Sequence, residues 1–438
     1  MNILIVGSGA REHAIAMALS KSTHKPKLFC FGTSWNPGIQ DLTLDYCVGD
    51  ITSPDRVNQQ AQQWRINLAI IGPEAPLERG VPDTLWASGI PVIGPKKNLA
   101  QIETSKAFAR ELMETYKISG LPKYKVFTCL EGVREFLSEL GENNYVVKAN
   151  GLMAGKGVKV AGEHLFSCED AVSYCKEIFD QNQSLVIEEK LIGQEFSFMC
   201  FSDGISLVPM PIVQDHKRAY EQDEGPNTGG MGSYSEADHS LPFLSSEDVR
   251  VAFEINQSVI MALMAETSDK YIGILYGGFI ATARGVYVIE FNARFGDPES
   301  LNVLSLLESD FVDLCIAMAS GNLKKESVSF LKKATVCKYA VPDGYPDNPL
   351  RHVEIDISDV EHKDNLYLAA VNLEDGKLYA TGSRTAAYVG VANTTKEAEE
   401  IAEQQINRIK GPLFHRKDIG TLPLINARIE AMRKLRVL

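Results

Sequence analysis

The first hundred residues alternate between short apolar runs and segments with apolar residues at helical spacing. The apolar runs predict strands at 2–6, 27–31, 68–71 and 91–93. The segments between them predict helices at 11–20, 54–64 and 82–87. Because strands and helices alternate with short connections, this pattern predicts a doubly wound parallel α/β sheet.

The pattern changes after about residue 104. We expect helices at 105–115, 171–179, 249–265 and 310–319, and strands at 145–148, 185–189, 196–201, 278–283 and 286–291. A long polar, irregular segment spans 214–236. The last hundred residues predict a separate small α+β unit, with strands at 334–341, 366–373 and 385–391 and a helix at 395–409.

Composition narrows the class of protein. The chain has 438 residues, of which 45% are hydrophobic and 23% charged, as in soluble globular proteins of two to four compact units. Its formal net charge of -13 disfavours non-specific binding to nucleic acid or anionic membranes. Eight cysteines without zinc spacing, no basic leader and no membrane-length apolar run predict a cytoplasmic protein with reduced thiols.

A charged strand end carries the first candidate chemistry. In a strand over 288–292, Glu290 and Asn292 share one face, and Ile289 and Phe291 share the other. A carboxylate and an amide oxygen at a strand end are suitable ligands for Mg²⁺. Charged residues also crowd into the turn that follows, at Arg294, Asp297 and Glu299. The alternative is a half-buried strand with a solvated face.

The turn Gly7-Ser8-Gly9 follows the first strand and opens a helix. Backbone amides at such a turn favour a phosphate group. A dinucleotide is disfavoured, because Glu12 stands where the third glycine would be and Gly32 where an acid would be. A single phosphate fits better, and the alternative is a plain tight turn.

A second glycine-rich loop follows the strand that ends near Lys148. Its glycines let the backbone approach phosphates closely, and Lys148 and Lys156 can neutralise phosphate charge. The spacing departs from a P-loop, because a glycine replaces the hydroxyl residue. The alternative is a mobile hairpin. The three glycines are Gly151, Gly155 and Gly157.

Two further segments suggest ligand contacts. The strand ending in Glu188 and Glu189 precedes Glu195, so open backbone groups could pair with adenine and a carboxylate could hold ribose. An acidic solvated turn is the alternative. In the segment 214–236, the dense mixture of charged and turn residues favours function. His216 has no orienting partner in the sequence, so we do not assign it as a general base.

Eight sequence runs occur together in one order: GSGAREH, IIGPEAPLERG, SKAFARE, VVKANGLMAGKGV, VIEEKLIGQEFS, QDHKRAYEQDEGPNTGGMGSYS, VIEFNARFGDPE and HRKDIG. Together they closely resemble the glycinamide ribonucleotide synthetase (phosphoribosylamine–glycine ligase) family of the ATP-grasp superfamily. The resemblance covers nearly the whole chain and is weakest over 342–365. It implies an N-terminal phosphoribosylamine-binding domain (1–104), an ATP-grasp domain (105–328, with a smaller lid lobe at about 123–192) and a C-terminal α+β domain (329–438).

The resemblance also implies a reaction. ATP phosphorylates the carboxylate of glycine, and the amine of 5-phosphoribosylamine attacks the acyl phosphate, which gives glycinamide ribonucleotide, ADP and phosphate in purine synthesis. ATP would be the co-substrate, with Mg²⁺ or Mn²⁺ bound by Glu290 and Asn292. The other partners would be these two small molecules, acting on a monomer or weak homodimer. The glycine-rich loop would be the lid that excludes water.

Further residue roles follow from the resemblance. Phosphate contacts would come from Lys106, Lys148 and the 151–157 loop. Adenosine contacts would come from Glu188, Glu195 and the backbone of 189–191, including Glu189 and Leu191. Arg294 would lie near the glycine carboxylate or the transferred phosphoryl group. Asp215 and Lys217 would line the acceptor side. The substrates would also contact Gly9, Arg11, Pro73, Glu74, Asp297 and Pro298.

Two departures from the family pattern stand out. Residues 272–289 contain no Asp or Glu, so a second metal ion would need ligands from elsewhere. Gly382-Ser383-Arg384 stands where the family usually has two glycines, which leaves its contact with the active site open. The alternatives are another ATP-grasp ligase, a nicotinamide-dependent oxidoreductase, or a nucleotide-binding regulatory protein without catalysis.

Overall fold

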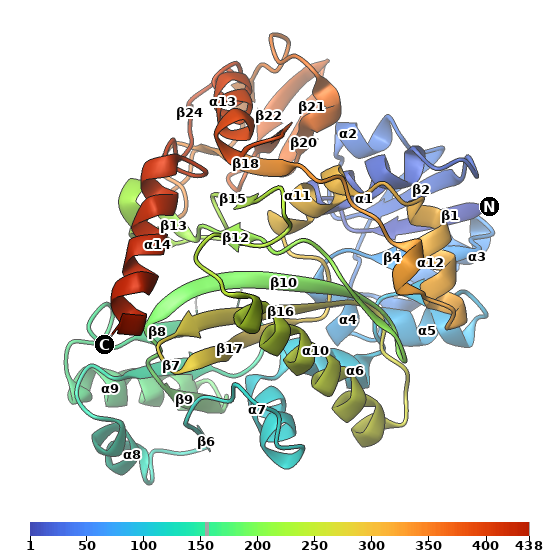
Figure 1. Ribbon diagram of the computed structural model, residues 1–438. Coiled ribbons are helices and arrows are strands. Elements are labelled where there is room, and N and C mark those ends of the chain that lie inside the picture. Colours follow the sequence, from blue (N-terminus) through green and yellow to red (C-terminus); the bar gives the residue numbers. More distant parts are fainter. Residues whose placement is uncertain (154–156, 438) are drawn as a thin grey trace.

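The computed structural model describes residues 1–153 and 157–437 and has four parts (Figure 1). The first is a parallel sheet with strand order β3-β2-β1-β4-β5, which confirms the predicted α/β domain. Its strands are β1 (Asn2–Val6), β2 (Lys27–Gly32), β3 (Asp45–Val48), β4 (Leu68–Ile71) and β5 (Val92–Ile93). Its helices are α1 (Ala10–Ser20), α2 (Pro37–Gln40), α3 (Pro54–Gln63), α4 (Glu74–Glu78) and α5 (Val81–Ala87).

Two consecutive helices lead from this domain into the rest of the chain, α6 (Lys97–Thr104) and α7 (Lys106–Thr115). The sequence predicted only the second. Ser105 separates them, because its extended backbone ends α6 and its hydroxyl accepts the Phe108 amide at the start of α7. The break turns α7 toward the next lobe.

The second part is a small lobe with its own hydrophobic core. Its antiparallel sheet has the order β6-β9-β7-β8 and packs with two helices. The elements are β6 (Tyr124–Phe127), α8 (Val133–Leu140), β7 (Tyr145–Ala149), β8 (Val158–Val160), α9 (Cys168–Asp180) and β9 (Leu185–Glu189). We call residues 124–189 the lid lobe. Because its core is separate from the main core, the lobe is an independent packing unit.

The third part is a curved sheet with order β11-β10-β16-β17. Its strands are β10 (Gly193–Asp203), β11 (Leu207–Pro209), β16 (Ile272–Thr282) and β17 (Gly285–Asn292). The helices that belong to it are α10 (Ser246–Thr267), α11 (Glu299–Leu306) and α12 (Phe311–Ser320). Ser245 and Asp248 form a capping box that begins α10. This central sheet carries the predicted metal ligands on β17.

The fourth part includes the orange and red strands at the top of Figure 1 and is not a self-contained sheet. Its main sheet has the order β12-β15-β18-β23-β20, with β24 paired to β18, so two strands come from the middle of the chain. The strands are β12 (Gln214–Asp215), β15 (Gly232–Ser235), β18 (Ala334–Pro342), β20 (Leu366–Leu368), β23 (Ala386–Ala392) and β24 (Leu413–Phe414). A smaller sheet contains β19 (Val353–Ile355), β21 (Val371–Glu374) and β22 (Lys377–Ala380), and the helices are α13 (Thr395–Ile406) and α14 (Leu422–Val437).

Two predictions about this part were wrong. The segment 214–236, expected to be irregular, contains β12, β15 and a hairpin of β13 (Arg218–Tyr220) and β14 (Glu224–Asn227). Its strands are too short and polar to show an apolar period. The predicted strand 366–373 is two strands in different sheets, because the Ala369 amide donates to the Thr385 carbonyl and the Ala370 amide to the Arg384 carbonyl.

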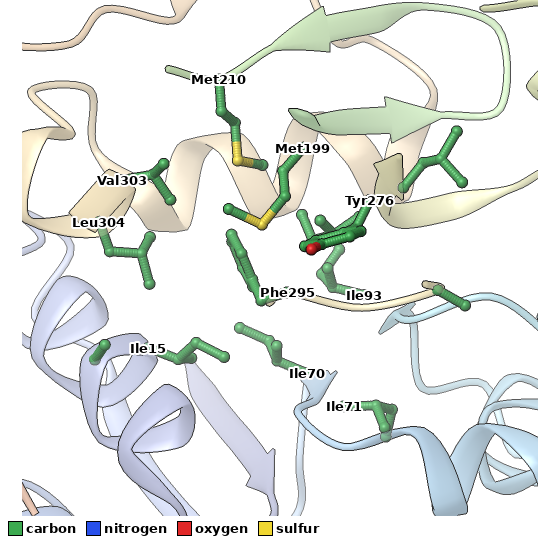
Figure 2. Close-up of a cluster of buried hydrophobic side chains, with 14 of the residues drawn as sticks. Ile15, Ile70, Ile71, Ile93, Met199, Met210, Tyr276, Phe295, Val303 and Leu304 are labelled. Carbon is green, nitrogen blue, oxygen red and sulfur yellow. The ribbon is translucent and has the colours of Figure 1, made fainter. Parts of the chain in front are cut away.

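The main hydrophobic core joins the N-terminal domain to the central sheet. Figure 2 shows Phe295 between isoleucines of the N-terminal domain and Met199 of β10. The Phe295 ring also contacts Phe201 edge-on, with centroids 6.3 Å apart. The turn after β17 is therefore anchored in the core directly beside its charged residues. Among the described residues, no helix is both long and apolar enough to span a membrane.

Candidate active site

A buried ion network joins the lid lobe to the central sheet. Glu188 of β9 receives hydrogen bonds from Arg110 Nε at 2.7 Å and Nη2 at 3.1 Å, and its Oε2 lies 2.7 Å from Lys148 Nζ. Lys148 Nζ and Arg110 Nη2 also donate to the Ile289 carbonyl of β17, at 3.0 and 2.8 Å. Burial alone would raise the pKa of Glu188, but Arg110 and Lys148 lower it to about 2. Both cations therefore contact β17, the strand that carries the predicted metal ligands.

Arg110 is a residue that the sequence reasoning missed. It lies on α7, 78 residues before Glu188 in the chain, and is only 2% exposed. Both carboxylate oxygens of Glu188 are engaged by protein cations. The geometry therefore favours Glu188 as the residue that positions Lys148 over a direct contact with adenosine.

Glu290 lies at the meeting point of several lysines. Lys217 Nζ is 3.6 Å from Glu290 Oε1 and 3.7 Å from Glu195 Oε2. Partial burial would raise the pKa of Glu290, but Lys217, Lys148 and Lys106 hold it below its usual value. The carboxylate is therefore ionised at neutral pH and surrounded by positive charge, as a metal ligand beside a polyphosphate requires.

The strand face around Glu290 differs from the prediction in one respect. Gly278 of β16 pairs with Glu290, but Phe279 pairs with Val288, so Ile289 forms a bulge. Ile289 consequently lines the same hollow as Glu290, where simple alternation put it on the opposite face. The bulge also turns the Ile289 carbonyl toward Lys148.

The residues present fit a magnesium ion that also binds phosphate. Glu290 and Asn292 offer two hard oxygens, and Asn292 Oδ1 accepts only one hydrogen bond, from Arg294 at 3.3 Å, among described residues. The strand beside Glu290 places Gly278 opposite it. Two protein oxygens are the usual set for Mg²⁺ that completes its shell with water and phosphate oxygens.

Lys106 extends from the first turn of α7 to the glycine-rich loop, where its Nζ donates to the Gly151 carbonyl at 2.8 Å. Gly151 has a φ of +95°, which favours glycine. At Gly157, a Cβ would come within 2.6 Å of Met153. Gly155 and Lys156 lie outside the described residues. The structure thus places Lys106 against the start of the glycine-rich loop, which follows Lys148 in the chain.

The linker after β9 is less open than the sequence suggested. The Glu189 and Lys190 amides donate to the carbonyls of 123 and 144, each at 2.9 Å. The carboxylate of Glu189 pairs with Arg284 at 2.7 Å. Within residues 1–153 and 157–437, the amide of Leu191 has no hydrogen-bond partner. Of the three backbone positions expected to face adenine, Leu191 is the one with a free amide.

The turn of the N-terminal domain is closed by its own glutamate. The Gly9 amide donates to Glu12 Oε2 at 2.5 Å, and Arg11 Nε donates to Glu12 Oε1 at 2.6 Å. A Cβ at Gly72 would lie 2.0 Å from this carboxylate, and Pro73 packs on Gly7. The anion at this helix start is therefore Glu12. A phosphate could use the Gly9 amide only by displacing it.

Arg294, in the turn after β17, connects the central sheet with the N-terminal domain. Its Nε lies 3.3 Å from Glu74 Oε2, and its Nη2 lies 2.9 Å from Glu103 Oε1. Glu103 Oε2 accepts the Ala293 amide at 2.6 Å. Burial raises the pKa of Glu103 to about 7, against the opposing effect of Arg294. Glu103 was missed because it lies on the buried face of α6, a helix that the sequence did not predict, 190 residues from Ala293.

The predicted acceptor side contains buried polar groups. Asp215 lines the hollow beside Lys217, and its Oδ1 is buried without a partner among described residues. Burial raises the pKa of Asp215. Behind it, Ser197 and Tyr276 both donate to Glu299 Oε1 at 2.9 Å. The sequence had grouped Glu299 with the charged turn but had assigned it no role.

Asp297 and Pro298 lie between this hollow and residues 329–438, which we call the C-terminal unit. Tyr339 donates to Asp297 Oδ1 at 2.6 Å, and Arg384 Nη1 lies 3.2 Å from the same oxygen. His216, which we did not assign as a base, is buried and has no partner for either ring nitrogen among described residues.

A lid lobe and a larger sheet that meet at Lys148, Glu188 and Glu290 define an ATP-grasp protein. Family models confirm this class and narrow it. They match phosphoribosylglycinamide synthetase at residues 1–103 (N domain), 104–300 (ATP-grasp (A) domain) and 335–422 (C domain). The chain belongs to the phosphoribosylglycinamide synthetase family.

Three similar proteins match this chain over nearly its full length. The chain is 50% identical over 436 residues to a phosphoribosylamine–glycine ligase of Methanosarcina barkeri, with all of both chains covered. It is 46% identical over 437 residues to one from Methanocella arvoryzae, again with full coverage. A crystal structure of the Thermotoga maritima ligase superposes with a TM-score of 0.81 at 27% identity, over 95% of this chain and 100% of that one.

A more distant structure shows the fold alone. The biotin carboxylase domain of the Hydrogenobacter thermophilus 2-oxoglutarate carboxylase superposes with a TM-score of 0.70 at 15% identity, over 99% of this chain and 93% of that one. That protein was crystallised with MgADP, ADP and bicarbonate. The full-length relatives identify the reaction where the shared architecture cannot: the chain is an ATP-dependent ligase that joins glycine to phosphoribosylamine in purine biosynthesis.

Proposed function

We propose that this ligase joins glycine to 5-phosphoribosylamine through a glycyl phosphate. One observation carries the proposal: in a chain of net charge -13, three lysines stabilise the ionised carboxylate of Glu290, namely Lys106 of α7, Lys148 of β7 and Lys217 between β12 and β13. Such a local concentration of positive charge around one ionised carboxylate suits a metal-bound triphosphate. The family relationship supplies the identities of the two acceptor substrates.

The first step would transfer the γ-phosphoryl group of ATP to a carboxylate oxygen of glycine, with ADP as the leaving group. Lys148, held by Glu188 and the Ile289 carbonyl, and Lys106 would neutralise phosphate charge. Glu290 and Asn292 would hold Mg²⁺ (or Mn²⁺), which polarises the transferred group when bound. Leu191 would offer its amide to the nucleotide, and Glu195 a carboxylate.

The second step would form a C–N bond between the amine of 5-phosphoribosylamine and the acyl carbon. The C–O bond to phosphate breaks, inorganic phosphate leaves, and the amine loses one proton. Asp215 and Lys217 would line this acceptor side, with Asp297 and Pro298 beside them. A charge near the acyl group is most useful when fixed in place, because it then needs no reorganisation as the reaction proceeds.

Arg294 is well placed between the two substrates. Glu74 and Glu103 of the N-terminal domain fix its guanidinium, and Asn292 accepts a hydrogen bond from it. We propose that Arg294 orients the glycine carboxylate as it is phosphorylated. Gly9, Arg11, Pro73 and Glu74 would surround the phosphoribosyl group on the N-terminal side.

The division into 1–104, 105–328 and 329–438 remains part of the proposal. The separate core of the lid lobe supports a unit that moves as one body to exclude water from the acyl phosphate. The glycine-rich loop at 151–157 would close with it.

ADP release tests this function directly. Purified protein is given ATP and Mg²⁺, with glycine and 5-phosphoribosylamine (made in place from ribose 5-phosphate and ammonia) added separately and together. We expect ADP and glycinamide ribonucleotide to form in equal amounts only when both are present. ADP release that is independent of glycine, or that requires bicarbonate instead, would overturn the assignment.

A further inference from the structure

Arg384 of the C-terminal unit extends into the centre of the molecule. It lies in the connection between β22 and β23, and its side chain is only 16% exposed. Its Nη1 donates to the carbonyls of Gly229, Gly230 and Asp297, at 2.8, 3.1 and 2.9 Å. One guanidinium thus gathers two loops that are distant in sequence.

Tyr339 of β18 supports the same arrangement. The Arg384 guanidinium lies over its ring, 4.5 Å from the centroid. The Tyr339 hydroxyl donates to Asp297 Oδ1 at 2.6 Å, and Arg384 Nη1 is 3.2 Å from that oxygen. The guanidinium is therefore held by a cation–π contact and an ion pair as well as by the three carbonyls.

The loop that Arg384 holds lies directly against the acceptor side. Gly230 has a φ of +110°, and a Cβ there would come within 2.6 Å of both Asp215 Oδ1 and Pro298 Cδ. The backbone at Gly230 is therefore in close contact with a carboxylate that lines the hollow beside Lys217. A displacement of this loop would displace Asp215.

We propose that Arg384 is a positioning residue through which the C-terminal unit fixes the loop 228–231 and Asp297, and through them Asp215, at the acceptor side. This inference rests on the proposed function for its kinetic consequence. The contacts themselves do not depend on the substrate. The site is then complete only when the C-terminal unit is docked, although Asp215 and Lys217 come from the middle of the chain.

An arginine suits this role better than a lysine. Its planar guanidinium offers five donors in a fixed geometry and stacks on an aromatic ring, whereas an ammonium is a compact point charge on a flexible stem. Arg384→Lys keeps the charge but cannot reproduce the stack and the carbonyl contacts together. Arg384→Gln removes the charge as well. The two variants therefore separate charge from geometry.

Hydrogen exchange gives a test that needs no activity. The amides of Thr228 and Met231 donate to carbonyls across the loop, at 2.7 and 2.8 Å, so their exchange reports loop opening. We expect a peptide covering 226–232 to exchange faster in Arg384→Gln than in the wild type, by about 10-fold or more. Arg351→Gln is the matched control, since Arg351 is exposed and donates, among the described residues, one long hydrogen bond to the Thr381 carbonyl of this same region, at 3.5 Å. Equal exchange in all three proteins would overturn the proposal.

Kinetics give the second test. We expect Arg384→Gln to lower kcat for glycinamide ribonucleotide formation by about 10–100-fold, as is typical for the loss of a supporting contact, with KM for ATP within about twofold of the wild type. The kcat of Arg384→Lys should lie between those of Arg384→Gln and the wild type. The kcat of Arg351→Gln should equal that of the wild type. A role in stability alone predicts a lower urea midpoint with unchanged kcat per folded molecule, and that result would contradict positioning.

A further variant keeps the test decisive if Arg384→Gln does not fold. Tyr339→Phe removes only the hydroxyl that holds Asp297, and we expect a smaller fall in kcat in the same direction. Wild-type kcat in Tyr339→Phe, with unchanged exchange of 226–232, would overturn the proposal. An inactive wild-type protein would instead refute the proposed function, while the exchange result would still decide the role of Arg384.

Discussion

The buried network around Glu188 gives a quantitative test of the site. Glu188→Gln would leave Arg110 and Lys148 without a counter-charge, and their side chains are only 3% and 9% exposed. Removing one partner from a buried ion pair costs about 3–5 kcal/mol. The pKa of Glu188 falls from 4.5 to about 2 in the folded state, which corresponds to about 3 kcal/mol. Both routes give a similar loss of stability.

This stabilisation has a defined pH range. Because the pKa is lower in the folded state, the contribution is fully present above pH 4.5, the value in the unfolded chain, and is lost as pH falls toward about 2. At neutral pH the wild type has the full contribution and Glu188→Gln has none of it.

Hydrogen exchange can locate the effect. Peptides covering β7 and β9 should exchange about 100-fold faster in Glu188→Gln at pH 7, the rate change that about 3 kcal/mol implies. The three tryptophans, at positions 35, 64 and 86, all lie in the N-terminal domain, so their fluorescence should report an unchanged unfolding transition there. The matched control is Glu169→Gln, which breaks an exposed pair with Arg134 in the same lobe and should leave exchange unchanged. If both variants exchange alike, the reasoning about the buried network is refuted.

Two further predictions concern the metal strand and the N-terminal domain. Glu290→Gln should lower kcat by about 100-fold or more, because an amide is a weak Mg²⁺ ligand, with an unchanged thermal midpoint; Glu254→Gln on the exposed face of α10 is the control, and a Glu290→Gln enzyme active at ordinary Mg²⁺ would contradict the metal role. Burial lowers the pKa of His13 from 6.5 to about 4, and its Nδ1 accepts the Leu368 amide at 2.9 Å. Because the pKa of His13 is lower in the folded state, its contribution to the free energy of unfolding is complete above pH 6.5. About 3 kcal/mol of that free energy is lost as the pH falls toward 4. Tryptophan fluorescence in urea should show this loss in the wild type, and an equal slope in His13→Gln would exclude His13 as its cause.

Local sequence patterns predicted much of the fold. The strand β9 has the predicted bounds, Leu185–Glu189, because its apolar run is continuous and its polar flanks are sharp. The strand β1 was predicted equally well. By contrast, β12 to β15 are two to four residues long and polar. They exist because neighbouring strands complete their hydrogen bonds, and no local periodicity records that.

The residues of the candidate site, like the strands, were predictable only where local sequence determines them. The positions of Lys148, Glu290 and Asn292 followed from strand ends and side-chain chemistry. The partners Arg110, Glu103 and Arg384 lie 78 to 190 residues from the groups they hold, so only the tertiary fold brings them together. The closure of the first turn by Glu12 was available in the sequence, since a glutamate at the third position of a helix can accept the amide of the residue before the helix, as in one half of a capping box. The bulge at Ile289 was not, because it depends on the register with β16.

Oxygen transfer from glycine tests the central claim most directly. Glycine labelled with ¹⁸O in its carboxylate is incubated with the protein, ATP, Mg²⁺ and 5-phosphoribosylamine, and the inorganic phosphate is analysed by mass spectrometry. If a carboxylate oxygen attacks the γ-phosphoryl group and leaves with it, each phosphate formed carries one ¹⁸O atom, and glycinamide ribonucleotide retains the other. Unlabelled phosphate formed alongside glycinamide ribonucleotide would contradict a glycyl phosphate at this site.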